Sequence, residues 1–234
     1  MRRALLSIAM VALLPLTSRA DYVPMSLAEL AGTSEAIARG TITKVEKGTV
    51  ALLVSESLAG PLQAGATITI RLFCDWPCAW RWSKYAVGQE VFLFLTFDKA
   101  RSEWGIRGAG GEGESPVVDG TVLANFDLPG RSVEYGDSPI GKARLNAVPY
   151  QQLRSAIVDF RSTYRLTPAR NPWRQAGDHV VHVPFDRIEL TTRSTTSPFR
   201  PRHPSPEFRQ RSYLHRYLAE IVEKERIKIE THKQ

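Results

Sequence analysis

The segment 90–97 reads Glu-Val-Phe-Leu-Phe-Leu-Thr-Phe and constrains the fold more than any other stretch of the chain. A strand with one face in water alternates apolar and polar side chains, so this apolar run is typical of a strand covered on both faces. Shorter strand-like runs precede it at 41–45, 50–54 and 67–72, separated by glycine and proline. The chain is therefore predicted to be mainly β, with a small closed barrel built from these segments.

Two amphipathic helices are predicted after the barrel strands. The first spans 149–164, because apolar residues recur there at steps of three and four, at Tyr150, Leu153, Ile157, Phe160 and Tyr164. We expect it to flank the barrel, and together they form a predicted domain over 21–165. The second helix is predicted over 205–230, where Ser205 can cap the first turn and Pro206 can occupy it.

The region between these helices has a different composition. Residues 166–204 are rich in proline, threonine and arginine, so they are predicted to be a linker without a packed core. Residues 165–234 hold 14 basic and 8 acidic side chains, whereas residues 21–164 hold 14 basic and 16 acidic ones. The basic excess lies in the C-terminal region. It indicates either simple solubility or contact of the C-terminal helix with an anionic surface.

The first 20 residues have the pattern of a signal peptide. Arg2 and Arg3 precede an apolar run over 4–16, and Ser18-Arg19-Ala20 supplies small residues at a cleavage site. The run is too short for a good membrane span. We therefore expect cleavage after Ala20, export to the periplasm or the medium, and no transmembrane segment in the remaining chain.

Cys74 and Cys78 are the two cysteines of the chain. In an exported protein, a local disulfide is the simplest interpretation of such a pair. A redox pair and a metal site are the alternatives, although the spacing differs from Cys-x-x-Cys and no histidine lies close by. The disulfide is predicted to shape the loop rather than to hold the fold.

The same loop concentrates aromatic residues at Trp76, Trp80 and Trp82, with Arg81 and Lys84 beside them. If exposed, these five residues would form an aromatic and cationic platform for a sugar, a peptide or an apolar partner. The alternative is that Trp80 and Trp82 pack against the end of the barrel, whereas Trp76 is expected to be exposed.

Other motifs carry less information about chemistry. The glycine-rich stretch 108–113 lacks the Lys-Ser/Thr of a phosphate loop and is read as a flexible hairpin. Asp119-Gly120 lies between apolar runs and predicts a type I′ turn, and residues 125–148 read as an irregular connection. On a strand, His179 and His182 would point to opposite faces, so no shared metal is expected.

Four segments, at 26–30, 37–42, 58–62 and 87–95, together resemble secreted bacterial proteins with a netrin/TIMP-like barrel. The resemblance covers roughly residues 26–125 and implies a five-stranded Greek-key barrel of the oligonucleotide/oligosaccharide-binding group. Members of that family that inhibit metalloproteases chelate zinc through a mature N-terminal cysteine. Here the predicted mature terminus is Asp21, so this activity is not expected.

The sequence favours a non-catalytic, exported binding or scaffolding protein that presents the tryptophan loop to a protein or glycan of the envelope. No cofactor, metal or specific nucleic acid is expected, and no nucleophile motif is present. Two alternatives remain open. One is an exported hydrolase whose site residues are scattered along the chain. The other is a protein that binds polyanions or the envelope surface through its basic C-terminal helix.

Overall fold

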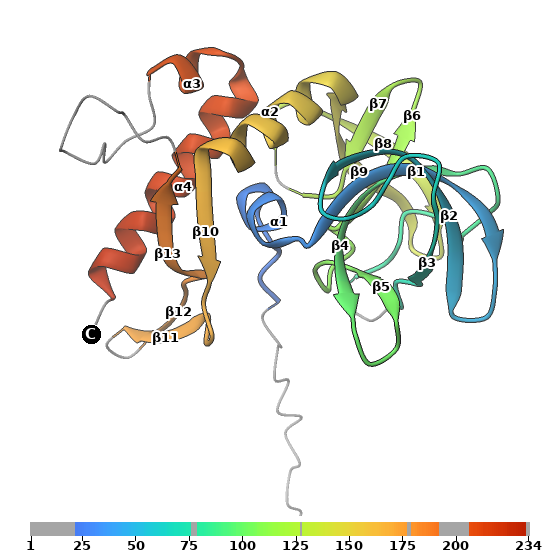
Figure 1. Ribbon diagram of the computed structural model, residues 1–234, viewed down its shortest axis with the longest axis horizontal. Coiled ribbons are helices and arrows are strands. Elements are labelled where there is room, and N and C mark those ends of the chain that lie inside the picture. Colours follow the sequence, from blue (N-terminus) through green and yellow to red (C-terminus); the bar gives the residue numbers. More distant parts are fainter. Residues whose placement is uncertain (1–21, 76–78, 127, 177–178, 192–205, 233–234) are drawn as a thin grey trace, which may run out of the picture.

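The computed structural model describes residues 22–75, 79–126, 128–176, 179–191 and 206–232. Figure 1 shows a barrel on one side, a lobe of helices and hairpins on the other, and the short helix α1 (Leu27–Thr33) between them. Within the described ranges, no helix has the length and apolar character needed to cross a membrane.

Five strands form the barrel, and each of them has two paired neighbours. They are β1 (Ala36–Val45), β2 (Thr49–Ala59), β3 (Thr67–Arg71), β4 (Glu90–Asp98) and β5 (Glu103–Ile106). Around the barrel they follow the order β1-β2-β3-β5-β4, and the β1–β4 pairing closes the circle. The β3–β5 pair is parallel, whereas the other four pairs are antiparallel. The predicted class, a mainly β chain with a small closed barrel, is confirmed.

The double cover predicted for the last core strand is also confirmed. Val91, Leu93 and Leu95 of β4 belong to the apolar cluster inside the barrel. Phe92 and Phe94, which alternate with them, belong to the cluster under the helices. Because successive side chains of a strand point to opposite faces, the apolar run fills both cores at once.

The sheet continues beyond the barrel, because β4 also pairs with β6 (Glu114–Val118). From there it runs through β7 (Thr121–Ala124) and β9 (Gly141–Pro149) to β8 (Arg131–Ser138). The predicted turn at Asp119-Gly120 joins β6 to β7, with positive φ angles of 48° and 71°. The prediction of an irregular connection over 125–148 was wrong, since β8 and most of β9 lie there. The alternation of apolar and polar residues in these two strands is too weak to stand out in the sequence.

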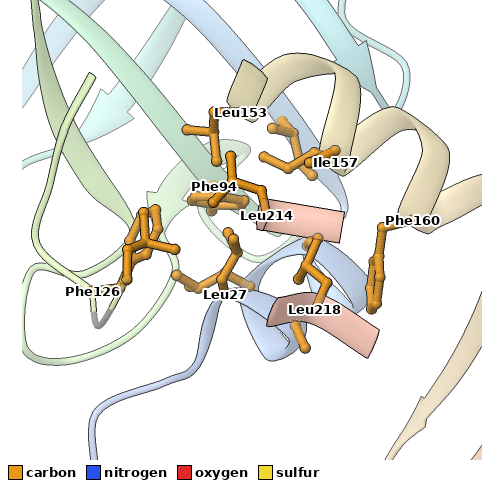
Figure 2. Packing of buried hydrophobic residues seen from close by; sticks show 14 of the residues in the cluster. Leu27, Phe94, Phe126, Leu153, Ile157, Phe160, Leu214 and Leu218 are labelled. Carbon is orange, nitrogen blue, oxygen red and sulfur yellow. The ribbon is translucent and has the colours of Figure 1, made fainter. Parts of the chain in front are cut away.

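Three helices pack together beside the barrel, and their apolar side chains share one core with Ile37 of β1 and with Phe92 and Phe94 of β4. The helices are α1, α2 (Tyr150–Thr163) and α4 (Tyr213–Thr231), so both predicted amphipathic helices are present. Ser26 and Glu29 form the capping box that begins α1. Figure 2 shows the apolar side chains that meet between these helices and the barrel, with Leu27, Phe94, Phe126, Leu153, Ile157, Phe160, Leu214 and Leu218 labelled.

The segment 166–204, predicted as a linker, begins with ordered strands instead. β10 (Tyr164–Pro168) pairs with β13 (Phe185–Leu190), and β11 (Trp173–Ala176) pairs with β12 (His179–His182). Leu166, Val183 and Phe185 are buried in the cluster shared with α1 and α4. A few apolar residues therefore suffice to order this region, because neighbouring helices cover them. Residues 192–205 of the predicted linker lie outside the described residues.

The final helical region is divided in two. A short helix, α3 (Pro206–Gln210), precedes α4, and Ser212 caps the start of α4. On the apolar face of α4, Leu214, Leu218 and Val222 are buried, whereas Tyr217 and Ile221 are partly buried.

Candidate functional site

The connection between β3 and β4, residues 72–89, carries the five side chains of the predicted aromatic and cationic platform. Trp80 is half-buried and Lys84 is exposed. Arg81 and Trp82 are buried, with 5% and 4% of their surface exposed. Because Arg81 and Trp82 contribute almost no exposed surface, the surface contacts proposed for this loop fall to Trp80 and Lys84. Trp76 lies outside the described residues.

The disulfide expected in this loop stays a prediction. Cys74 is exposed at the end of the segment that follows β3. Its expected partner, Cys78, lies outside the described residues.

A buried ion pair holds the base of the loop. Nη2 of Arg81 lies 2.7 Å from Oε1 of Glu114, and Nε lies 3.1 Å from both carboxylate oxygens. The guanidinium also donates to the backbone oxygen of Ser83 and to Oε1 of Gln89, at 2.5 and 3.0 Å. Both side chains of the pair are almost fully buried, at 4% and 2% exposure. Such a pair is held in place because loss of either partner leaves an uncompensated charge.

Aromatic rings enclose the same guanidinium. The Cζ atom of Arg81 lies 3.9 Å from the ring centroid of Trp82 and 3.7 Å from that of Tyr85. The Tyr85 hydroxyl donates to Oε2 of Glu114 at 2.8 Å and accepts from the amide of Phe73 at 3.0 Å. Burial and the negative charge of Glu114 raise the pKa of Tyr85, so the hydroxyl remains a donor. The network thus ties together both ends of the loop.

A second buried carboxylate fixes the neighbouring glycine-rich segment. Glu112 is 1% exposed, and it accepts hydrogen bonds from the Tyr22 hydroxyl, the Met25 amide and the Gly110 amide. Burial and the bond to Glu112 raise the pKa of Tyr22. The stretch 108–113 is therefore anchored to the N-terminal segment, which differs from the flexible hairpin expected there.

The two loops leave the barrel together and flank an open hollow of about 310 Å³. Parallel strands end at the same edge of a sheet, and β3 and β5 pair in parallel at Arg71 and Gly105. The chain leaves that edge through the Cys74 segment on one side and the glycine-rich segment on the other. The hollow between them is lined by Arg71, Leu72, Phe73, Cys74, Ile106, Gly108 and Ala109.

The position of Trp82 is fixed by strand β8. The amide of Asp137 donates to the backbone oxygen of Trp82 at 3.0 Å. Gly136 has a φ of +83°, and a Cβ atom there would lie 1.9 Å from the same oxygen. Glycine is therefore required where the loop crosses β8.

The structure brings together one serine, one histidine and one aspartate in the C-terminal lobe. Oγ of Ser212 lies 2.7 Å from Nδ1 of His215, and Nε2 of His215 lies 2.9 Å from Oδ2 of Asp159. In a catalytic triad the serine meets Nε2 and the carboxylate meets Nδ1, so the two ring nitrogens are exchanged here. Ser212 is also the N-cap of α4, and His215 is 2% exposed. We read this cluster as a link between α2 and α4.

Several cations of the C-terminal helical region are paired within the protein. Arg211 lies 2.6 Å from Asp159, Arg226 lies 2.7 Å from Glu223 and Lys228 lies 2.7 Å from Glu225. Glu223 and Glu225 already belong to the eight acids counted over 165–234, so only Asp159 reduces the basic excess of this region further, by one charge. His182 packs against the ring of Trp173, at 4.9 Å between centroids, and the side chain of His179 is not described. Among the described residues, no group of three metal-ligating side chains lies close enough to hold an ion.

The sequence reasoning did not identify the buried carboxylates that organise the site. Their signal in the sequence was the placement of two acids in a glycine-rich stretch next to an apolar strand, a setting in which a charge needs a partner. The partners, Tyr22 and Arg81, are distant in sequence and could not be assigned.

Comparisons of this chain with protein-family models, with curated proteins and with solved structures find no match. The resemblance to netrin/TIMP-like barrels therefore stays a prediction.

Proposed function

We propose that this chain is an exported, non-catalytic binding protein that presents the end of its barrel to a component of the cell envelope. The proposed surface consists of the exposed part of the 72–89 loop and the hollow that lies between this loop and the glycine-rich segment 108–113. Trp80 and Lys84 are its proposed contacts on the loop.

The observation that carries the proposal is the contrast between the base and the rim of this loop. At the base, the Arg81–Glu114 pair is buried, and its guanidinium is hydrogen-bonded to Glu114, Ser83 and Gln89. At the rim, Cys74 and Lys84 are exposed and Trp80 is half-buried. A rigid base that holds a half-buried aromatic group and an exposed cationic group lowers the ordering cost of binding. This arrangement suits recognition better than catalysis.

The N-terminal segment supports the same surface. Tyr22 and Met25 bind Glu112, and Gly108 and Ala109 line the hollow. Cleavage after Ala20, as the sequence predicts, would leave only Asp21 ahead of Tyr22. The mature chain would then begin beside the proposed surface, so removal of the leader would clear the access to it.

The proposal can be tested by affinity recovery from an envelope extract with the immobilised mature chain. Trp80→Ala and Lys84→Ala are expected to reduce recovery of the same partner by about fivefold or more, since buried aromatic anchors dominate interfaces. Trp173→Ala is the matched control, because Trp173 is a 43% exposed tryptophan in the opposite lobe. Protease treatment of the extract separates a protein partner from a glycan.

Thermal unfolding of each variant shows whether the fold is retained. If the wild type, both loop variants and Trp173→Ala all recover the same amount of partner, the loop is not part of the binding surface. Turnover of ester or peptide substrates by the purified chain would instead favour the hydrolase.

A further inference from the structure

A second hollow, of about 350 Å³, lies on the other side of the same loop, where Trp82 meets β8 and the β6–β7 turn. We infer that it receives the positively charged side chain of a lysine or arginine from a partner protein. The inference rests on the proposed function, because it assigns a partner chemistry to the surface beside the 72–89 loop. The lining residues are Trp82, Gly88, Gln89, Glu90, Pro116, Val117, Val118, Asp119 and Tyr135.

Aromatic rings form one wall of this hollow. Trp82 and Tyr135 contact each other with 5.6 Å between ring centroids and an angle of 49° between their planes. The guanidinium of Arg81 already lies over the indole of Trp82. Because Arg81 occupies one face of the indole, the ring left to receive a further cation is that of Tyr135, which is half-buried.

The charge of the lining favours a cation as well. Glu90 and Asp119 are its ionisable residues, and neither lysine nor arginine lines the hollow. Oε1 of Glu90 accepts from Arg39 at 2.6 Å, which neutralises this carboxylate in part. Asp119 is exposed and has no ion-pair partner among the described residues. Asp119 therefore supplies the uncompensated negative charge.

The remaining wall suits the aliphatic stem of a long cationic side chain. Pro116, Val117 and Val118 are apolar and lie along the strand that leads to Asp119. Lysine and arginine bury their methylene groups against such surface and keep the charged end near carboxylates. The indole N–H of Trp82 is buried without an acceptor in the described part of the chain. A backbone carbonyl of the partner would satisfy this donor.

The indole N–H of Trp82 also provides a direct reporter. We would titrate the ¹⁵N-labelled mature chain with the blocked tripeptide acetyl-Gly-Lys-Gly-amide and follow that signal by NMR. A saturable shift is expected with the lysine peptide but not with the neutral acetyl-Gly-Met-Gly-amide. Butylamine should bind several-fold more weakly, because it lacks a backbone carbonyl. If butylamine binds as tightly as the lysine peptide, the hollow is a site for free amines, and the inference that a partner protein fills it is overturned.

Asp119→Asn removes the charge and suits the turn, because asparagine tolerates the positive φ angle of 48°. Its Kd for the lysine peptide should rise about threefold or more, as expected for one exposed charge contact. Glu134→Gln is the matched control: this residue neighbours Tyr135 on the strand but does not line the hollow. An unchanged Kd in Asp119→Asn, or no shift with any peptide, would overturn the inference.

This test is independent of the proposed function. Peptide binding combined with unchanged partner recovery in Trp80→Ala would support the hollow and contradict the loop. Reduced recovery in Trp80→Ala without peptide binding would support the loop and contradict the hollow.

Discussion

The buried pair of Arg81 and Glu114 allows the sharpest prediction. Glu114→Gln keeps the shape of the side chain and one carbonyl acceptor but removes the negative charge. Arg81 retains its bonds to Ser83 and Gln89, yet its charge loses the only carboxylate that lies within hydrogen-bond distance of it in the described structure. Breaking a buried ion pair from one side costs about 3–5 kcal/mol. For a chain of this size, that loss lowers Tm by roughly 6–20 °C.

Urea unfolding of the mature chain at pH 7 measures this loss. Glu46→Gln is the control, because Glu46 pairs with Lys44 where both side chains are at least half exposed, and such a pair contributes at most about 1 kcal/mol. The double variant Arg81→Gln/Glu114→Gln should lose less than the sum of the two single losses, by about 1–3 kcal/mol. If Glu114→Gln remains within about 1 kcal/mol of the wild type, the pair does not hold the loop and the rigid base of the proposed surface is refuted.

Two predictions concern the helices. Phe160→Ala should cost about 3–5 kcal/mol of stability, because the Phe160 ring is completely buried on the inner side of α2. Val158→Ala, on the exposed side of the same helix, should cost about 0.5 kcal/mol or less. Similar melting temperatures for the two variants would contradict the packing. Burial alone would raise the pKa of Asp159, but bonds from Arg211 and His215 lower it below 3.8. The resulting stability is present above about pH 4 and is lost as the pH falls through the lower, folded-state pKa. Asp159→Asn should therefore be less stable than the wild type at pH 7 in urea unfolding, and the difference should shrink as the pH falls below about 4. A difference that stays constant with pH would exclude this linkage.

Strongly periodic elements could be predicted from the sequence because their signals are local. The run 90–97 indicated a strand covered on both faces, and Asp119-Gly120 indicated a hairpin turn. The stripe of Leu153, Ile157 and Phe160 indicated a packed helix. All three are present. By contrast, the strands of 164–190 were missed, since their few apolar residues become buried only when α1 and α4 cover them.

The candidate site was predicted only in outline. The sequence pointed to the loop that contains Trp80, Arg81, Trp82 and Lys84, and the start of the same loop, at Leu72, Phe73 and Cys74, lines a hollow. It could not show that Arg81 and Trp82 turn inward, because their burial depends on Glu114, a residue 33 positions further along the chain.

The sequence by itself determined the secondary structure that short-range periodicity and turn chemistry specify, and with it the mainly β class of the chain. The tertiary structure alone decided which polar residues are buried together, as at Arg81 with Glu114 and at Tyr22 with Glu112. It also decided where the hollows lie, because they form only where β3 and β5 end side by side and where β8 crosses the loop. Contacts of this kind join residues tens of positions apart, and closure of the barrel, rather than any local pattern, brings them together.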